Sequence, residues 1–194
     1  IRYKTLFLHQ NIYNKNVILL LNLRSAAAML KKVSFSPIID AQAKILILGS
    51  LPGDKSLTLQ EYYGHPQNRF WKLIGMLLNF TPNSSYSAKI TQLQSRQVAL
   101  WDVCGSAFRP GSMDSDIQQV SPNAIPELLA AYPAIHTIFF NGQKAETLFN
   151  KHSNRAPKRH YIKLPSTSPA NATYRIEDLL VHWQQIPLSL KHEN

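Results

Sequence analysis

Asn68 and Tyr63 are the side chains whose type and position most clearly indicate chemistry in this sequence. An asparagine amide can bind a water molecule and a substrate together, and an aromatic ring can stack on a planar ligand. Both residues follow a short apolar run at 44–48 and a Gly-Pro turn at 49–53, and they flank His65, where we expect a helix to open. Open α/β sheets bind ligands at the carboxyl ends of strands. The sequence therefore predicts a binding site here.

The turn at 49–53 (GSLPG) is the second part of this predicted site. Glycine at both of its ends allows backbone amides to approach a ligand, and proline stiffens it. We therefore assign all of its residues to substrate binding: Gly49, Ser50, Leu51, Pro52 and Gly53. The segment does not match a phosphate-binding loop, because Asp54 stands where a glycine must precede Lys55 and Ser56.

Four short apolar runs must position this site: 44–48, 97–103, 135–140 and 160–164. Helical patterns of apolar residues alternate with them, beginning after Pro66, after Ser121-Pro122, around 145–149 and over 176–186. Strands that alternate with helices predict a mainly parallel sheet covered on both faces, a three-layer α/β sandwich. The loops that follow the strands should converge at one edge of the sheet: 49–53, 101–106, 141–145 and 164–171.

The composition favours an ordered domain with a polyanionic partner. Of 194 residues 44% are apolar, which is enough for a core, and the net charge of +10 favours nucleic acid. The single cysteine, Cys104, excludes a disulfide framework and any multi-cysteine metal site within the chain, and the histidines lack metal-ligand spacing. No apolar run is long enough to span a bilayer. We expect a cytoplasmic protein that binds no metal.

The first 28 residues differ from the rest, because they hold no Asp or Glu and several Asn. We interpret residues 1–28 as an extension outside the domain. An exported leader is the alternative, and it is disfavoured because the apolar run at 17–21 is short and is followed by Asn22 and Arg24. Residues 29–194 are predicted to form a single functional domain.

Four motifs occur in order along the chain: GSLPG (49–53), EYYGHPQNRFW (61–71), LWDVCGSAFRPGSMDSDI (100–117) and LPSTSPAN (164–171). Through them the sequence resembles the uracil-DNA glycosylase superfamily, and most of all its hypoxanthine (deoxyinosine) DNA glycosylase branch, family six. The resemblance implies a four-stranded parallel sheet between helices. It also implies a monofunctional enzyme of base excision repair that hydrolyses the N-glycosidic bond of a deaminated base in double-stranded DNA, without cofactor. We expect it to act as a monomer.

The resemblance also implies roles for individual residues. Asn68 is expected to be catalytic, holding a water below the sugar and contacting the base, while Tyr63 stacks on the extruded base. His65 is assigned to the substrate pocket with the turn at 49–53. The LPSTSPAN segment is expected to press into the duplex through Ser166, Thr167, Ser168, Pro169, Ala170 and Asn171.

Leu51 is the main departure from related branches. Mismatch-specific uracil enzymes carry their catalytic asparagine at this place, and leucine can neither orient water nor accept a proton. Two alternatives stay open: a mismatch-specific uracil/thymine-DNA glycosylase, and a non-catalytic nucleic-acid-binding member of the fold. Asp102 is a secondary candidate for activating water, although we favour a role in anchoring its loop. Five basic residues are candidates for phosphate contacts, although each of them taken alone is more simply a solvated surface charge: Lys55, Arg69, Arg109, Lys144 and Arg175.

Overall fold

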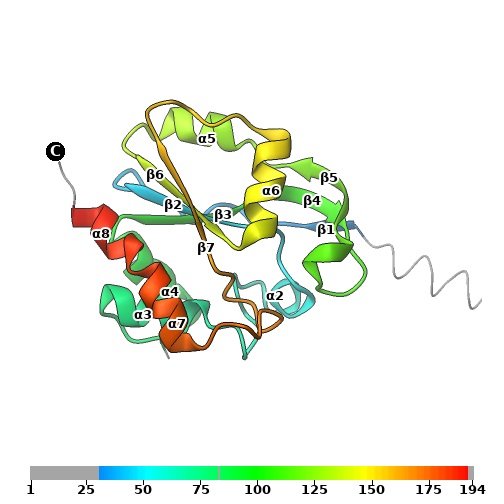
Figure 1. Ribbon diagram of the computed structural model, residues 1–194, viewed down its shortest axis with the longest axis horizontal. Coiled ribbons are helices and arrows are strands. Elements are labelled where there is room, and N and C mark those ends of the chain that lie inside the picture. Colours follow the sequence, from blue (N-terminus) through cyan, green and yellow to red (C-terminus); the bar gives the residue numbers. More distant parts are fainter. Residues whose placement is uncertain (1–30, 83, 192–194) are drawn as a thin grey trace, which may run out of the picture.

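The structure is a computed structural model that describes residues 31–82 and 84–191 (Figure 1). Its centre is a four-stranded sheet in the order β3-β2-β6-β7, with every neighbouring pair parallel. The strands lie close to the predicted runs: β2 (Ile45–Gly49), β3 (Val98–Asp102), β6 (Thr137–Asn141) and β7 (His160–Leu164). The predicted parallel sheet is therefore confirmed.

Helices cover both faces of this sheet (Figure 1). One face packs against α5 (Ile125–Ala131) and α6 (Gln143–His152), and the other against α3 (Phe70–Leu78), α4 (Tyr86–Gln94), α7 (Ile176–Trp183) and α8 (Gln185–Lys191). Successive side chains of a strand point to opposite faces. Leu46 and Leu48 of β2 accordingly join the first core, whereas Ile45 and Ile47 join the second. The three-layer α/β sandwich is confirmed.

A small antiparallel sheet lies beside the central one and was not predicted. It pairs β4 (Cys104–Phe108) with β1 (Lys31–Val33) on one side and β5 (Gln118–Pro122) on the other, and a short 3-10 turn, Asp114–Asp116, precedes β5. The prediction of a loop over 101–106 is therefore wrong. Residues 104–108 become a strand because β1, more than seventy residues earlier, pairs with one edge and β5, the next strand along the chain, pairs with the other.

The helices show three further differences from the sequence pattern. The helix expected to open at His65-Pro66 begins only at Phe70, and α2 (Asp54–Leu59) and α4 were not predicted. The predicted helix over 176–186 is divided after Trp183. Pro187 explains this break, because a proline has no N–H and its ring clashes with the carbonyl group four residues earlier.

The predicted extension, residues 1–28, lies outside the described residues. Within 31–82 and 84–191, no helix combines the length and the apolar character that crossing a membrane requires.

Candidate active site

A cavity of about 440 Å³ opens at the carboxyl ends of the parallel strands. Its wall includes the last residues of β2, β3 and β6, which are Gly49, Asp102 and Asn141. Every residue assigned to the site from sequence lines it: Gly49, Ser50, Leu51, Pro52, Gly53, Tyr63, His65, Asn68, Asp102, Ser166, Thr167, Ser168, Pro169, Ala170 and Asn171. Small-molecule pockets measure about 300 to 1,000 Å³, so this cavity can hold a purine base.

Asn68 lies in the turn that leads into α3. Its backbone N–H donates to the carbonyl oxygen of His65 at 2.8 Å, and its side-chain Oδ1 accepts from the N–H of Phe70 at 3.0 Å. The second contact caps the first turn of α3 and fixes the amide. Among the described residues, the Nδ2 group makes no hydrogen bond, and Oδ1 retains a free lone pair. The side chain can therefore cap the helix and still bind a water or a base.

Tyr63 stands beside Asn68 in the cavity wall. Its ring stacks on Phe70, with centroids 3.9 Å apart and planes 23° apart. Its φ of +54° is unusual for a bulky residue, and such left-handed conformations are held in place by their surroundings. The neighbouring Tyr62 supplies part of this support, because its backbone N–H and carbonyl bind Tyr86 and Trp71.

The hydroxyl group of Tyr63 is buried and has no hydrogen-bond partner among the described residues. Burial, and then the negative charge of Asp102, raise the pKa of this phenol well above its usual range. A neutral ring therefore lines the cavity, with its hydroxyl group directed toward Asn141. Its stacking on an extruded base stays a prediction, and the packing on Phe70 gives the ring a rigid backing.

Arg109 holds the first turn, which is our name for residues 49–53. Its guanidinium group is 1% exposed and donates from Nη1 and Nη2 to the carbonyl oxygens of Leu51 and Pro52. Asp114 supplies the counter-charge, with its Oδ1 3.3 Å from Nη1 of Arg109 and 2.8 Å from the hydroxyl of Ser50. A phosphate contact by Arg109 is therefore ruled out, because its guanidinium is enclosed behind the first turn.

Asp102 lies against the start of the same turn. A Cβ atom on Gly49 would stand 2.3 Å from Oδ1 of Asp102, so only glycine fits at position 49. The carboxyl group is almost fully buried, and its Oδ2 accepts a hydrogen bond from the Ser34 hydroxyl at 2.7 Å. Burial raises the pKa of Asp102 to about 7, and the Ser34 bond and the charge of Arg109 only partly oppose this rise.

The rim loop, defined here as residues 165–171, closes the opposite side of the cavity. Thr167 is fully buried in it: its Oγ1 accepts from Nδ2 of Asn141, and its N–H donates to Oδ1 of Asn141, both at 2.9 Å. The Thr167 side chain therefore anchors the loop from inside, and the assignment of Thr167 to the DNA-binding segment stays a prediction. Pro169 and Ala170 are exposed at its tip, and a DNA contact through them stays a prediction.

Comparisons with known proteins agree with this geometry. The family model described as the uracil DNA glycosylase superfamily matches residues 36–185. The chain belongs to this superfamily. Two relatives named hypoxanthine DNA glycosylase, from Methanosarcina barkeri and Methanosarcina acetivorans, are 38% and 39% identical over 60% and 59% of this chain and 74% and 73% of their own lengths.

A solved structure from the same superfamily supports the fold. The solution NMR structure of a protein from Methanosarcina acetivorans, described as a candidate uracil DNA glycosylase, is 34% identical to this chain. It superposes with a TM-score of 0.71, over 84% of this chain and all of that one. The four-stranded parallel sheet between helices that the resemblance implied is therefore shown.

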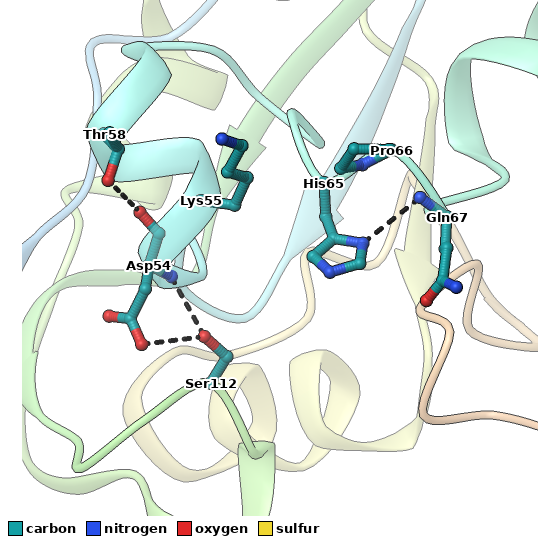
Figure 2. Close-up of a pocket in the computed structure, with 7 residues that line it drawn as sticks. All are labelled: Asp54, Lys55, Thr58, His65, Pro66, Gln67 and Ser112. Atoms are coloured by element: carbon teal, nitrogen blue, oxygen red, sulfur yellow. Dashed lines mark hydrogen bonds between the residues drawn. The ribbon is translucent and has the colours of Figure 1, made fainter.

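A wider, shallower hollow of about 680 Å³ adjoins the cavity of this glycosylase-family chain (Figure 2). Lys55, His65 and Ser112 line both of them. Figure 2 shows that α2 supplies Lys55, that the loop before α3 supplies His65, and that Ser112 reaches in from a third segment. The His65 ring accepts the N–H of Gln67 at 3.2 Å through Nδ1. His65 and Lys55 thus stand where the hollow and the cavity adjoin.

Several residues that line the cavity were not assigned to the site from sequence, among them Arg109 in its structural role, Asp114 and Asn141. Asn141 opens the loop 141–145, which was expected at this edge of the sheet, although no role was assigned to its side chain. Asp114 lies within the third motif, 100–117, but no role was assigned to it, because its contacts with Ser50 and Arg109 depend on how distant segments fold together. Within the part of the chain that the structure describes, no group of three or more candidate metal ligands occurs.

Proposed function

We propose that this chain is a monofunctional DNA glycosylase that removes deaminated bases, chiefly hypoxanthine from deoxyinosine, by hydrolysing the N-glycosidic bond. The position of Asn68 in the wall of a purine-sized cavity, with Tyr63 and the first turn, carries the proposal. The superfamily membership and the two relatives named hypoxanthine DNA glycosylase support it.

Asn68 is the group to which we assign the chemistry. In the reaction the bond between C1′ and the base breaks, its electron pair stays on the base, the oxygen of a water bonds to C1′, and the proton which that water releases ends on the departed base. An amide is too weak a base to remove a proton fully, so its contribution is to hold the water and contact the base. The hydrogen bond from Phe70 to Oδ1 keeps the amide in one orientation for this task.

The first turn is assigned to the departing base. Negative charge develops on the base as the bond breaks, and fixed backbone N–H groups can stabilise it without reorganising. Arg109 keeps this turn rigid by holding two of its carbonyl groups. Leu51, in contrast, is a buried apolar side chain and offers nothing to the edge of a pyrimidine. We therefore assign the pocket to a purine.

A product assay tests this function. Labelled duplexes that differ only in one deoxyinosine or one deoxyuridine are incubated with excess enzyme, and abasic sites are revealed by alkali. We expect faster cleavage at inosine than at uracil in the same context. Faster cleavage at uracil paired with guanine would instead assign the chain to the mismatch-specific branch. Tight binding to both duplexes without any abasic product would favour the non-catalytic alternative.

Other features of the proposal concern the protein as a whole. Residues 29–194 act as a single domain and a monomer, on double-stranded DNA in the cytoplasm, and use neither metal nor cofactor. The net charge of +10 supports the DNA partner, since phosphate neutralisation supplies most of the nonspecific affinity.

A further inference from the structure

Arg69 makes an unusual set of contacts for a residue next to the proposed catalytic Asn68. Its side-chain hydrogen bonds all go to backbone carbonyl oxygens of the rim loop or the segment just after it: Ser166, Thr167, Ser168, Asn171 and Tyr174. Its own backbone N–H also donates to Thr167, at 3.1 Å. One guanidinium group therefore donates hydrogen bonds to several carbonyl oxygens of a segment about a hundred residues away. Arginine can do this because its planar guanidinium carries five N–H donors.

These contacts give the rim loop a fixed shape before any DNA is present. The Arg69 guanidinium binds the loop from one side, while Asn141 holds Thr167 through two hydrogen bonds from β6. A preformed loop loses less conformational entropy when it binds. Arg69 is also the residue that directly follows Asn68 in the chain. The position of the rim loop is therefore linked to that of the proposed catalytic amide.

We propose that Arg69 is a positioning residue, which holds the rim loop in the shape needed to extrude a base from duplex DNA, rather than a phosphate contact. This inference rests on the proposed glycosylase function. It predicts a selective loss: cleavage in a duplex should depend on Arg69, whereas cleavage in a single strand, where the base is already unstacked, should depend on it much less.

The test compares Arg69→Lys with the parent on inosine in duplex and in single-stranded DNA. Lysine keeps the positive charge but presents only three donors at one point, so the carbonyl contacts are lost and the electrostatic attraction is kept. We expect single-turnover cleavage of the duplex to fall about tenfold or more, and that of the single strand to change less than about threefold. Equal losses on both substrates, or no loss on either, would overturn the proposal.

Arg96→Lys is the matched control. Arg96 also donates to backbone carbonyls, those of Leu78, Asn79 and Gln92, but it does so at the opposite end of α3 and lines none of the cavities described above. It therefore reports what losing a carbonyl-binding arginine does to the fold alone. We expect its ratio of duplex to single-strand cleavage to equal that of the parent.

Hydrogen exchange tests whether Arg69 holds the rim loop, and this measurement does not depend on enzymatic activity. In free Arg69→Lys, the amides of the rim loop should exchange about tenfold faster or more than in the parent, and those of α4 should not. Thr167→Val, which removes the acceptor for Asn141, should shift the same amides in the same direction and serves if Arg69→Lys does not fold. If the rim-loop amides of Arg69→Lys exchange as slowly as those of the parent, the proposal that Arg69 holds the rim loop is overturned. If the parent cleaves neither substrate, the glycosylase function fails, and exchange still decides the role of Arg69.

Discussion

Two loops form opposite walls of the cavity, and an arginine holds each of them by its carbonyl groups. Arg109 holds the first turn, and Arg69 holds the rim loop. They differ in their counter-charges. Arg109 is fully buried and pairs with Asp114, whereas Arg69 is half-buried and has no ion pair among the described residues. A cation enclosed in protein needs a compensating charge, and one near the surface does not.

This difference divides the cavity electrostatically. Behind the first turn, positive and negative groups lie together in Arg109, Asp114 and Asp102, and their charges largely cancel. Below the rim loop, the Arg69 charge is bound only by neutral carbonyl oxygens. A base is neutral, so the compensated wall suits the base, whereas the Arg69 charge, which makes no phosphate contact in our proposal, adds only to the long-range attraction of an anionic duplex. The predictions below test this division.

The largest effect is expected at the rim-loop side, from Asn68→Ala. If Asn68 holds the water and the base, single-turnover cleavage of inosine should fall by about 10² to 10⁴, the range for a positioned catalytic group. The fold and DNA affinity should be retained, because the lost cap contact is a single hydrogen bond. Rapid-quench measurement of abasic sites, with a duplex-binding titration, checks both. Activity near that of the parent would reduce Asn68 to a helix cap.

Salt should have the second-largest effect. If basic residues such as Lys55, Lys144 and Arg175 neutralise a few phosphates, the slope of log affinity for undamaged duplex against log salt should be about −3 or steeper. Binding should then weaken by about 60-fold between 50 and 200 mM salt. Fluorescence anisotropy with a labelled duplex measures the slope. Arg69→Lys should leave it unchanged because the charge is conserved, and salt-independent binding would contradict a DNA substrate.

The smallest effect on catalysis is expected from Asp102→Asn, on the compensated side. Asparagine can still accept the Ser34 hydrogen bond, so the loop stays anchored, and cleavage should fall less than about tenfold. A complete loss, together with a mild effect of Asn68→Ala, would transfer the activation of water to Asp102 and reverse the assignment of the two walls.

The same variant has a distinct effect on stability. The pKa of Asp102 is raised to about 7 in the folded protein, so folding takes up a proton between about pH 4 and pH 7. Its contribution to stability therefore falls as the pH rises through that window. Asp102→Asn removes this penalty: its melting temperature should exceed the parent's by about 5 °C at pH 8, with a smaller difference at pH 5. Calorimetry at the two pH values provides the check.

The sequence by itself determined the central sheet and the place of the site. Short apolar runs such as 44–48, each followed by small and polar residues, are local patterns, and they predicted the strands correctly. Asn68, Tyr63 and the first turn were found in the same way, because residues at the carboxyl ends of parallel strands must meet at one edge.

The tertiary structure alone decided what the two arginines and Thr167 do. In the sequence Arg69 and Arg109 are both candidates for phosphate contacts or simple surface charges, and nothing local distinguishes them. Arg109 is enclosed behind the first turn and binds Leu51, 58 positions away in the chain. Arg69 binds the rim loop at Thr167, 98 positions away. Thr167 was expected to contact DNA, and Asn141 holds it inside. Whether a polar side chain meets solvent, a carboxylate or a carbonyl depends on which distant segments fold against it, and its own neighbours in the chain do not specify that.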